Sequence, residues 1–430
     1  MPAETGKDEQ IYSSIHQMKK SSNYSSFFSR AVCVIFLALL GIACSSQPKS
    51  PPAKAPQVKP AAPVEGSTLP QPEQQLEPAI ATESPALVPE PQTPPAQGRR
   101  LQIGAVGDVM LGTDFPENWL ADDDGASLLS HVVPILRQPD VTFINFEGTL
   151  LDGGEPRKRC PNPKTCYLFR TPERYVKYLV EAGVDVASLA NNHARDFGES
   201  GRGTTMQVLA AAGIRHSGLD GDVASWEVKG LRVAMIAYAP FAYSHDFLDI
   251  PRAQRQVRDL AADHDIVIVS MHAGAEGVDF NRVTFKREVF HGENRGNVHE
   301  FSHAVIDAGA DLVIGHGPHV VRALELYQDR LIAYSLGNFA TYFGISVSGK
   351  KGYAPILLVD LDEHGRFIEG RIVSAIQKRP GGPVVDFQHR AAREIAELTQ
   401  ADFPDTPLRI GPYGSLMRLE QLPPTVSSSR

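Results

Sequence analysis

The sequence predicts an α/β domain over residues 99–376, with its core between Leu101 and Ser374, and two observations carry this prediction. Short apolar runs alternate with amphipathic segments, which is the pattern of strands that alternate with helices. Several apolar runs also end in Asp, Glu, Asn or His, the residue types that bind divalent cations. One such ending means little, but five in one chain indicate a site beyond the carboxyl ends of the strands.

Residues 1–44 have the pattern of an export signal. Basic residues precede the apolar run Ala31–Ala43, which is too short for an ordinary membrane span. The run ends at Cys44 in a sequence that resembles a bacterial lipobox, although Gly41 stands where Leu is usual. We expect an exported protein, anchored at the membrane by a lipid on Cys44 and facing the periplasm or the cell exterior. An uncleaved anchor and plain secretion are the alternatives, and translation from Met18 would give a more ordinary signal.

Residues 45–98 are expected to form a disordered, Pro-rich tether. They hold 14 of the 33 prolines and no Phe, Tyr or Trp. Such a stretch cannot bury a core and favours extended conformations. It is interpreted as a link between membrane and domain, or as a spacer of no specific length.

The charge of the chain argues against a polynucleotide partner. Its 42 basic and 50 acidic residues give a formal net charge of -8. No run of Lys or Arg is long enough to predict a nucleic-acid groove.

Two cysteines lie inside the predicted domain, at Cys160 and Cys166, and enclose two prolines. In an exported protein this spacing favours a small disulfide loop, because the compartment is oxidising and the prolines turn the chain. A zinc knuckle is the alternative, but no second cysteine pair accompanies it.

Eight apolar runs are predicted as strands because of their length and their flanking polar or glycine residues. They are Leu101–Val106, Val141–Asn145, Val184–Leu189, Arg232–Ala239, Asp265–Met271, Asp311–Ile314, Leu331–Ser335 and Pro355–Leu361.

Helices are predicted between several of these strands. One spans residues 171–183, where Pro and Glu suit the first turn and apolar side chains recur on one face. Another spans Val298–Ala308 and stops at a glycine. Residues 377–430 are expected to form an irregular C-terminal extension with one helix near Ala391–Leu398.

The polar residues that follow the strands predict a metal site. They are Asp108, Glu147, Asn191, Asn192, His193, His272, His316 and His319. Carboxylate, imidazole and amide oxygen suit hard or borderline divalent metals, and two metals about 3.5–4 Å apart need a shared carboxylate. We expect two divalent ions; the sequence does not distinguish Mn, Zn, Fe and Mg.

Six motifs then resemble the CapA family of capsule or poly-γ-glutamate synthesis proteins, in the expected order between about Gln102 and Val373. They are Gly107-Asp108-Val109-Met110-Leu111-Gly112, Asn145-Phe146-Glu147, Leu189-Ala190-Asn191-Asn192-His193 with Asp196 and Gly198, His272-Ala273-Gly274-Ala275-Glu276, Gly315-His316-Gly317-Pro318-His319-Val320 and Tyr334-Ser335-Leu336-Gly337-Asn338-Phe339. The resemblance implies a four-layer α/β/β/α sandwich similar to calcineurin-like metallophosphoesterases.

The resemblance also implies ligand roles. Asp108 and His319 would bind the first metal, and Glu147 would bridge the two metals. Asn192, His272 and His316 would bind the second metal.

Two residues of the motifs would act on the substrate, and three would support the site. His193 would act on the leaving group, and Asp196 would orient it. Asn191, Glu276 and Asn338 are expected to contact substrate or support the ligands. Glu276 would buttress His272 through its second ring nitrogen, and Asn338 would shape a turn.

Three departures from the related families are expected to matter. Met110 stands where metallophosphoesterases have a His, which predicts a weaker first metal site. Ala273 would open the pocket wall where CapA-type sequences commonly have Trp, and Gly317 removes a possible His ligand. Residues Gly277–Asn297 are expected to form a loop near the site that influences the choice of substrate.

Five histidines outside the motifs are interpreted as ordinary surface or core residues. They are His216, His245, His291, His299 and His303.

Three functions remain open from the sequence. The first is a membrane-tethered capsule or poly-γ-glutamate biosynthesis protein with a hydrolase-like site. The second is an active metal-dependent phosphoesterase or amide hydrolase that acts on an envelope polymer. The third is a non-catalytic assembly factor that binds an anionic polymer, with capsule synthesis or export machinery as a partner.

Overall fold

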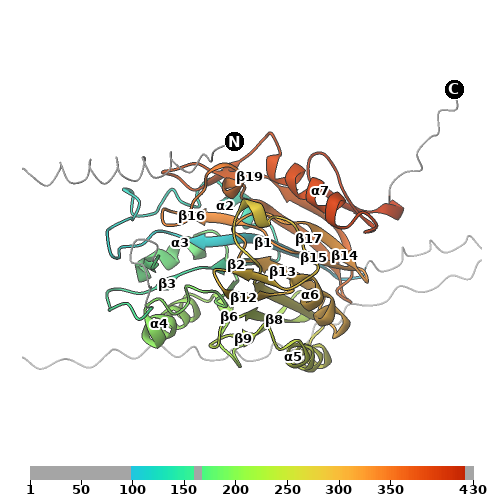
Figure 1. The fold of residues 1–430 in the computed structure, drawn as a ribbon, viewed down its shortest axis with the longest axis horizontal. Coiled ribbons are helices and arrows are strands. Elements are labelled where there is room, and N and C mark those ends of the chain that lie inside the picture. The colour runs from blue at the N-terminus through green and yellow to red at the C-terminus, as the bar shows by residue number, and fades with distance from the viewer. Residues whose placement is uncertain (1–97, 159–166, 422–430) are drawn as a thin grey trace, which may run out of the picture. The chain divides into compact units, whose positions relative to one another are not determined.

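The structure is a computed structural model, and it describes residues 98–158 and 167–421. The predictions for the export signal, for lipidation at Cys44, for the Pro-rich tether and for a Cys160–Cys166 disulfide lie outside these residues. All described residues fall within one compact unit of the chain, Val88–Arg430. Within them, two large β-sheets carry the fold and are called here the first and second sheets (Figure 1).

The first sheet has nine strands in the described residues, in the order β21-β22-β18-β17-β1-β2-β5-β6, with β16 paired to β1. Its strands are β1 (Arg100–Met110), β2 (Val141–Phe146), β5 (Val186–Ser188), β6 (Arg215–Ser217), β16 (Asn338–Thr341), β17 (Ile356–Asp362), β18 (Phe367–Val373), β21 (Leu408–Ile410) and β22 (Ser415–Arg418). Strands β1, β2, β5 and β6 run parallel, so their carboxyl ends share one edge.

The second sheet has seven strands in the described residues, in the order β14-β15-β13-β10-β8-β7, with β9 paired to β8. Its strands are β7 (Ala224–Val228), β8 (Leu231–Ala239), β9 (His245–Asp246), β10 (Ile266–His272), β13 (Leu312–His316), β14 (Leu324–Tyr327) and β15 (Arg330–Ala333). Its central strands β8, β10, β13 and β15 are parallel. Every residue of β10 is buried, as expected for a parallel strand that is covered on both faces.

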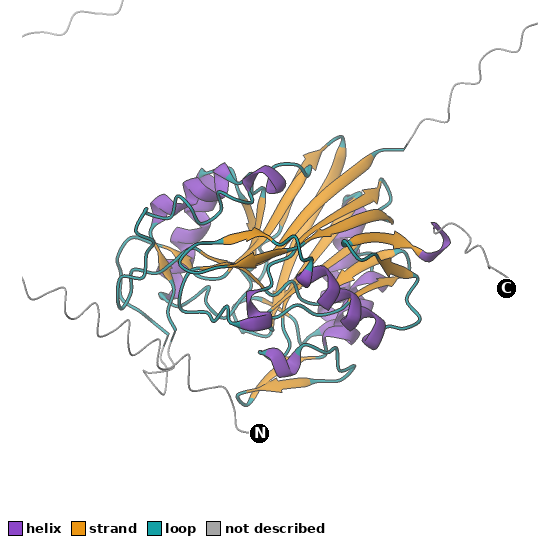
Figure 2. Ribbon diagram, turned by 90° about the horizontal axis from the view of Figure 1, so that it is seen from above, coloured by secondary structure: helices purple, strands orange, loops and turns teal. Residues whose placement is uncertain are grey.

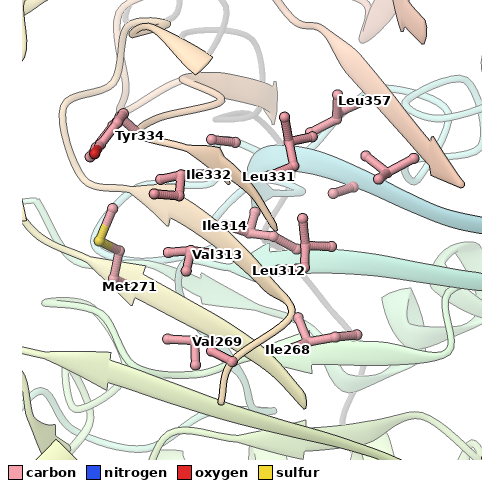
Figure 3. Close-up of a cluster of buried hydrophobic side chains, with 14 of the residues drawn as sticks. Ile268, Val269, Met271, Leu312, Val313, Ile314, Leu331, Ile332, Tyr334 and Leu357 are labelled. Carbon is pink, nitrogen blue, oxygen red and sulfur yellow. The ribbon is translucent and has the colours of Figure 1, made fainter. Parts of the chain in front are cut away.

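The two sheets pack face to face through apolar side chains. Ile103 and Ala105 of β1 belong to the same buried cluster as the strands of the second sheet. Figure 3 shows side chains of β10, β13 and β15 gathered beneath Leu357 of β17, a strand of the first sheet. Val106 and Val109 of β1 belong instead to a second buried cluster, which includes residues of α2, α3 and α4.

Helices cover the outer faces of both sheets (Figure 2). The α-helices are α2 (Val133–Leu136), α3 (Val176–Glu181), α4 (Gly198–Ala211), α5 (Ile250–Asp263), α6 (Val298–Asp307) and α7 (Arg390–Asp402). Residues of α2, α3 and α4 pack on the first sheet, and residues of α5 and α6 pack on the second. The predicted α/β fold with four layers is therefore confirmed.

Smaller elements complete the described chain. They are the strand pairs β3 (Thr149–Leu150) with β4 (Arg170–Thr171), β11 (Glu288–Phe290) with β12 (Glu293–Gly296) and β19 (Ala375–Gln377) with β20 (Pro383–Val385), and the 3-10 turns η2 (Glu173–Tyr175), η3 (Val278–Phe280), η4 (Gly349–Gly352) and η5 (Leu419–Gln421).

Polar caps fix the start of two helices beside the second sheet. The side chain of Asp249 accepts a hydrogen bond from the backbone N–H of Arg252 at 3.0 Å and caps α5. Asn297 caps α6 by accepting from the backbone N–H of Glu300 at 3.3 Å, and its amide donates back to the Glu300 carboxylate at 3.1 Å. These caps fix the first turn of each helix.

All eight predicted strands are present, with small shifts at their ends, and the predicted helices correspond to η2 with α3, to α6 and to α7. The prediction of an otherwise irregular C-terminal extension was wrong. Strands β21 and β22 join the edge of the first sheet through β18, and α7 contacts both β14 and β18. These two strands have three and four residues, too few to produce a recognisable hydrophobic alternation.

Within the described ranges, none of the helices has the length and apolar content needed to cross a membrane.

Candidate functional site

The candidate site lies where the carboxyl ends of the two sheets meet. In the first sheet, Asp108 pairs in register with Asn145 on β2, and Glu147 follows β2 directly. In the second sheet, His272 and His316 are register partners at the ends of the parallel strands β10 and β13. Each sheet therefore supplies half of the predicted ligands.

Asp108 joins the two halves. Its Oδ2 atom lies 2.9 Å from Nδ1 of His319, and its Oδ1 atom lies 3.3 Å from Nδ1 of His316. The amide of Asn145 donates a hydrogen bond to Oδ1 at 2.8 Å. Burial alone would raise the pKa of Asp108, but His316 and His319 outweigh it and hold the pKa far below its ordinary value. Asp108 is therefore an ionised, fully buried carboxylate.

Glu147 is fully buried, and neither of its carboxylate oxygens has a hydrogen-bond partner among the described residues. Its Oε1 atom lies 3.7 Å from Nε2 of His319 and 4.0 Å from Nε2 of His193. Burial and then the charge of Asp108 raise the pKa of Glu147 well above its ordinary value. A cation placed between Glu147 and Asp108 would favour the ionised form of Glu147 and so oppose this rise in its pKa.

His319 lies between the two carboxylates. Burial lowers its pKa, but the charges of Glu147 and Asp108 prevail and raise the pKa of His319 to about 10. Its backbone is left-handed, with φ at +56°, and Asn338 donates a hydrogen bond to its carbonyl oxygen at 3.2 Å. The carboxyl of Asp108, the carboxyl of Glu147 and the imidazole of His319 each offer an atom within 4.8 Å of the others, as a shared metal ion would require.

His272 and His316 are buried imidazoles, and the 3.3 Å approach of Nδ1 of His316 to Asp108 lacks hydrogen-bond geometry. Neither ring nitrogen of either residue has a hydrogen-bond partner in the described part of the chain. Burial lowers the pKa of His272 well below its ordinary value. A neutral imidazole with an unpaired nitrogen is the form that binds a metal.

His193 is held by Asp196. Nδ1 of His193 lies 2.7 Å from Oδ2 of Asp196, which also accepts a hydrogen bond from the backbone N–H of Phe169 at 2.9 Å. The ring of Phe169 lies against the imidazole, with 4.2 Å between centroids. Lys158 forms an ion pair with the other oxygen of Asp196 at 3.2 Å. Burial lowers the pKa of His193, so the ring is neutral near pH 7.

The two asparagines before His193 have different environments. The amide of Asn191 donates to the backbone oxygen of Phe146 at 2.9 Å, and its side-chain oxygen accepts from the backbone N–H of His193 at 3.1 Å. Asn191 therefore shapes the loop. Asn192 instead lines the cavity, and its buried side-chain oxygen has no hydrogen-bond partner among the described residues.

The expectation that Glu276 buttresses His272 was wrong. Glu276 forms an ion pair with Arg295 at 3.0 Å, and its other oxygen lies 4.0 Å from Nε2 of His319. The backbone of Gly274 and of Gly277, on either side of Glu276, has positive φ, at +87° and +106°. Glu276 thus belongs to the rim of the site.

Asn338 supports His319 and the segment that follows it. Its amide donates to the carbonyl oxygens of Ser346 and Lys351 at 3.2 and 3.1 Å, as well as to that of His319. Its side-chain oxygen lies 3.0 Å from Nδ1 of His319. Asn338 therefore fixes a ligand-type residue and one wall of the cavity.

The three departures from the related families have physical explanations. Met110 is buried with Phe169 and Ile345, and its sulfur accepts from the backbone N–H of Gly112 at 3.2 Å. A Cβ atom on Gly317, whose φ is +110°, would lie 2.9 Å from the carbonyl oxygen of Ala273. The expected opening of the pocket wall by Ala273 is absent, because Ala273 is buried and does not line the cavity.

A cavity of about 740 Å³ opens over the cluster. It is lined by Lys158, Tyr167, Phe169, Asn192, His193, Glu276, Gly277, Phe290, His291, Glu293, Arg295, His319, Gly344, Ile345, Ser346 and Lys351. Residues from the predicted loop Gly277–Asn297 do lie at the site, including His291, which was interpreted as ordinary. The sequence did not single out the cationic residues Lys158, Arg295 and Lys351; of these, only Arg295 lies in the loop that was expected near the site.

Arg295 has a free hydrogen-bonding edge beside this cavity. It is buried and forms ion pairs with Glu276 and Glu293, both at 3.0 Å. Its Nη1 atom is buried without a hydrogen-bond partner in the described residues. A guanidinium edge of this kind suits a carboxylate or phosphate oxygen of a ligand.

The residues present fit divalent metal ions. Seven buried atoms have no hydrogen-bond partner among the described residues: both oxygens of Glu147, both ring nitrogens of His272 and of His316, and the side-chain oxygen of Asn192. Leaving such an atom unpaired costs about 1–3 kcal/mol. Together they offer the oxygen and nitrogen donors that Mn²⁺, Fe²⁺ or Zn²⁺ accept.

Comparison with known proteins gives one family match, which covers more than half of the chain. Residues 102–342 match the model described as bacterial capsule synthesis protein PGA_cap. The capsule biosynthesis protein CapA of Bacillus anthracis is 27% identical over 265 residues, which are 56% of this chain and 60% of that protein. The PGA biosynthesis protein CapA of Bacillus subtilis (strain 168) is 27% identical over 256 residues, 56% of this chain and 63% of that protein. The chain thus spans less than two thirds of the length of these relatives.

Among solved structures, the chain is similar to a 5'-nucleotidase precursor from Thermus thermophilus, at 12% identity and a TM-score of 0.37, over 70% of this chain and 59% of that chain.

Proposed function

The chain belongs to the bacterial capsule synthesis protein family PGA_cap, and on that premise we propose that it is an envelope protein whose strand-end cluster is a two-metal, hydrolase-type site acting on an anionic polymer. The membership agrees with the resemblance predicted from the motifs. The polymer class follows the names of the two relatives, which concern capsule and PGA biosynthesis.

The observation that carries the proposal is the set of unpaired donor atoms around Glu147. Fully buried carboxylates and imidazoles are normally hydrogen bonded, and exceptions require an explanation. Here Glu147, His272 and His316 are all exceptions and converge from two sheets. Two metal ions would satisfy them together, with Glu147 as the shared ligand.

The proposed ligand sets follow the proximity of the side chains. Asp108 and His319 would hold the first metal; Asn192, His272 and His316 would hold the second. Metal ions bound there would supply Lewis acidity and positive charge to the reacting group. Met110 contributes no hard ligand, which supports weaker binding at the first position.

His193 would perform the proton transfer. Asp196 engages Nδ1, so Nε2 is the atom left to exchange a proton with the leaving oxygen or nitrogen of the substrate. Phe169 restricts the ring by packing against it at a tilt and by its backbone N–H bond to Asp196. His193 also lines the cavity, as a group that meets substrate must.

The cavity rim would recognise the polymer. Lys158, Arg295 and Lys351 lie around an opening that also holds the aromatic residues Tyr167 and Phe290. Cationic groups next to apolar rings suit a chain of carboxylates or phosphates joined by apolar segments. The bond to be cleaved would then be an amide or a phosphoester of that chain.

A second candidate function is a non-catalytic assembly factor that binds the same polymer. The observation in its favour is Met110, whose sulfur and side chain fill the position of a phosphatase His and so weaken the first metal position. The cationic residues of the cavity lining, Lys158, Arg295 and Lys351, called here the cationic rim, would bind the polymer equally well in this function. The two candidates differ in whether His193 and Asp196 are needed.

The chemical test uses full-length protein purified without chelator. We expect two equivalents of Mn²⁺, Fe²⁺ or Zn²⁺ per chain, and cleavage of a generic phosphoester or of poly-γ-glutamate that depends on the metal. Asp108→Ala should lose both metal and activity, whereas His193→Ala should lose activity alone. Protein that binds no metal under these conditions would refute the two-metal site.

The genetic test separates the two candidates. Deletion of the gene should remove surface polymer, and the wild-type gene should restore it. Failure of His193→Ala to restore the polymer, at normal protein level, would support catalysis. Full restoration by His193→Ala and by a folded metal-site variant would support the assembly factor instead.

The proposed setting is the cell envelope, with the chain exported and tethered through a lipid on Cys44. Cys44→Ala should then move the protein from the membrane fraction to the soluble fraction. Unchanged fractionation would refute tethering through that residue, without bearing on the metal site.

A further inference from the structure

A second cluster of metal-ligand side chains lies at the edge of the second sheet. His299 and His303 are four residues apart on α6 and so lie on one face of the helix. Glu325 is on β14, the edge strand of the second sheet. Each of the three residues offers one ligand atom, and these atoms all lie within 4.8 Å of one another. The cluster shares no residue with the strand-end site.

The carboxylate of this cluster is held in place from the protein interior. Tyr334, which is fully buried, donates its hydroxyl hydrogen to Oε2 of Glu325 at 2.7 Å. Nε2 of His303 lies 3.1 and 3.0 Å from the two oxygens of Glu325. The ring of His303 also stacks on Tyr327, with 3.7 Å between centroids. Carboxylate ligands of metals are characteristically fixed by such an outer hydrogen bond.

His299 is positioned by aromatic packing rather than by hydrogen bonds. Its ring contacts Phe285 with 4.7 Å between centroids and lies 4.0 Å from the ring of His303. In the described ranges, no hydrogen bond to either ring nitrogen of His299 is present. Burial, and then the neighbouring His303, lower the pKa of His299.

The donor types select the class of metal. Two imidazoles and one carboxylate suit borderline transition metals such as Zn²⁺, Ni²⁺ and Co²⁺, whereas Ca²⁺ and Mg²⁺ prefer oxygen alone. In such sites metal–ligand bonds are about 2.0–2.2 Å, so ligand atoms lie about 3–3.5 Å apart. The His303–Glu325 separation already has this value.

We propose that His299, His303 and Glu325 form a binding site for one Zn²⁺-class ion, which fastens α6 to β14. Three protein ligands leave a fourth position for water or for a group from outside. His299 and His303 are both partly exposed, so the ion can enter from solvent. Both residues were interpreted as ordinary from the sequence, because the carboxylate that completes the site follows His303 only after 22 positions, on a strand that was not predicted.

The test uses Zn²⁺ as the probe and the full-length protein. The chain is stripped with chelator, reloaded with excess Zn²⁺, desalted and analysed for zinc per chain. His299→Gln, His303→Gln and the double variant are each expected to hold one equivalent less than the wild type. The matched control is Glu300→Gln on the same helix, which should hold the wild-type amount, because Glu300 is not one of the three proposed ligands and its side chain accepts from Asn297 of the helix cap.

Stability gives a second readout. Zn²⁺ should raise the melting temperature of the wild type by more than that of His299→Gln, in which one proposed ligand is lost and a partly exposed side chain is changed. The difference of one equivalent is expected whether the strand-end site holds two ions or none, so failure of that site does not affect this test. Equal zinc content in wild type and both single histidine variants would overturn the proposal.

Discussion

The carboxylate of Asp196 meets Nδ1 of His193 at 2.7 Å and the backbone N–H of Phe169 at 2.9 Å through the same oxygen. That oxygen therefore fixes both the tautomer and the direction of the imidazole. Because the two residues are three positions apart in one loop, the arrangement does not depend on the docking of the two sheets.

Asp196→Asn is expected to lower metal-dependent turnover of a generic phosphoester by roughly 10²–10⁴-fold, the contribution typical of a positioned proton-transfer group. The amide would favour the wrong tautomer of His193, while the bound metal should remain unchanged. Turnover and metal content are measured on the same preparation. Asp222→Asn is the matched control, because Asp222 contacts Nδ1 of His216 at 2.9 Å outside the cavity. Full activity of Asp196→Asn would contradict the role given to His193.

Glu147→Gln is expected to act in opposite directions with and without metal. Without metal, it removes a buried acid whose ionisation is opposed by burial and by the charge of Asp108, so the free energy of unfolding should rise at neutral pH. With metal at about 100 times its dissociation constant, the wild type should gain roughly 2.7 kcal/mol and the variant much less. Urea unfolding with and without Mn²⁺ measures both effects. A variant that gains as much from Mn²⁺ as the wild type does would exclude Glu147 as the shared ligand.

Removal of the cationic rim is expected to weaken polymer binding. The double variant Lys158→Gln/Lys351→Gln should bind poly-γ-glutamate at least several-fold more weakly than wild type at low ionic strength, because two cavity-lining charges are lost. Salt should reduce the difference. Lys286→Gln, an exposed residue outside the cavity lining, provides the control. Equal affinity of the double variant and the control would show that the polymer binds elsewhere.

Arg322→Ala is expected to destabilise the protein by about 3–5 kcal/mol. Arg322 is fully buried and pairs with both oxygens of Glu288, at 2.9 and 2.7 Å. The same carboxylate accepts from the backbone N–H of Ala275, so the pair ties β11 to the loop after His272. Arg287→Ala, at an exposed position, should change stability by about 0.5 kcal/mol or less. A small loss for Arg322→Ala in urea unfolding would contradict this tie.

Asp386→Asn tests how much the Asp386–Arg390 pair in the C-terminal segment stabilises the fold, and how that stabilisation changes with pH. Hydrogen bonds from Arg390 lower the pKa of Asp386 from 3.8 to about 2. A carboxyl whose pKa is lower in the folded state stabilises the fold at pH values above its unfolded-state pKa. This stabilisation is lost as the pH falls toward 2. The variant should therefore lose about 1–2 kcal/mol at pH 7, after allowance for the partial exposure of Arg390, and less at pH 3. Urea unfolding at both pH values, with the exposed Asp405→Asn as control, measures the change; an equal loss at both pH values would contradict it.

The main strands could be predicted because each is a buried run long enough to contrast with its flanks. In β10, for example, all seven residues are buried. The edge strands β21 and β22 could not be predicted. Only Leu408 and Leu416 are buried in them, so their sequences show no alternation of apolar and polar residues. Their positions depend on pairing with β18, which is set far earlier in the chain.

The candidate ligands could be predicted because they follow strands, and strand ends meet at a common edge. The partner of Glu276 could not, because Arg295 meets Glu276 only through the tertiary fold. Arg295 and Lys158 reach the cavity from segments without periodic pattern, and their contribution depends on tertiary contacts with Glu276 and Asp196. Sequence thus indicates which residues gather at the strand ends better than it indicates the residues that surround them.

The division of the candidate site between two sheets has a consequence for folding cooperativity. Asp108 and His316 are separated by about 200 positions in the chain. Local structure alone cannot bring them together, so their contact requires both sheets to be formed and packed. A partly folded chain with one sheet formed would offer only half of the donors and bind an ion weakly. An ion held by the complete set would therefore oppose separation of the two sheets. Its binding free energy would add to the cost of global opening and not to the stability of either sheet alone.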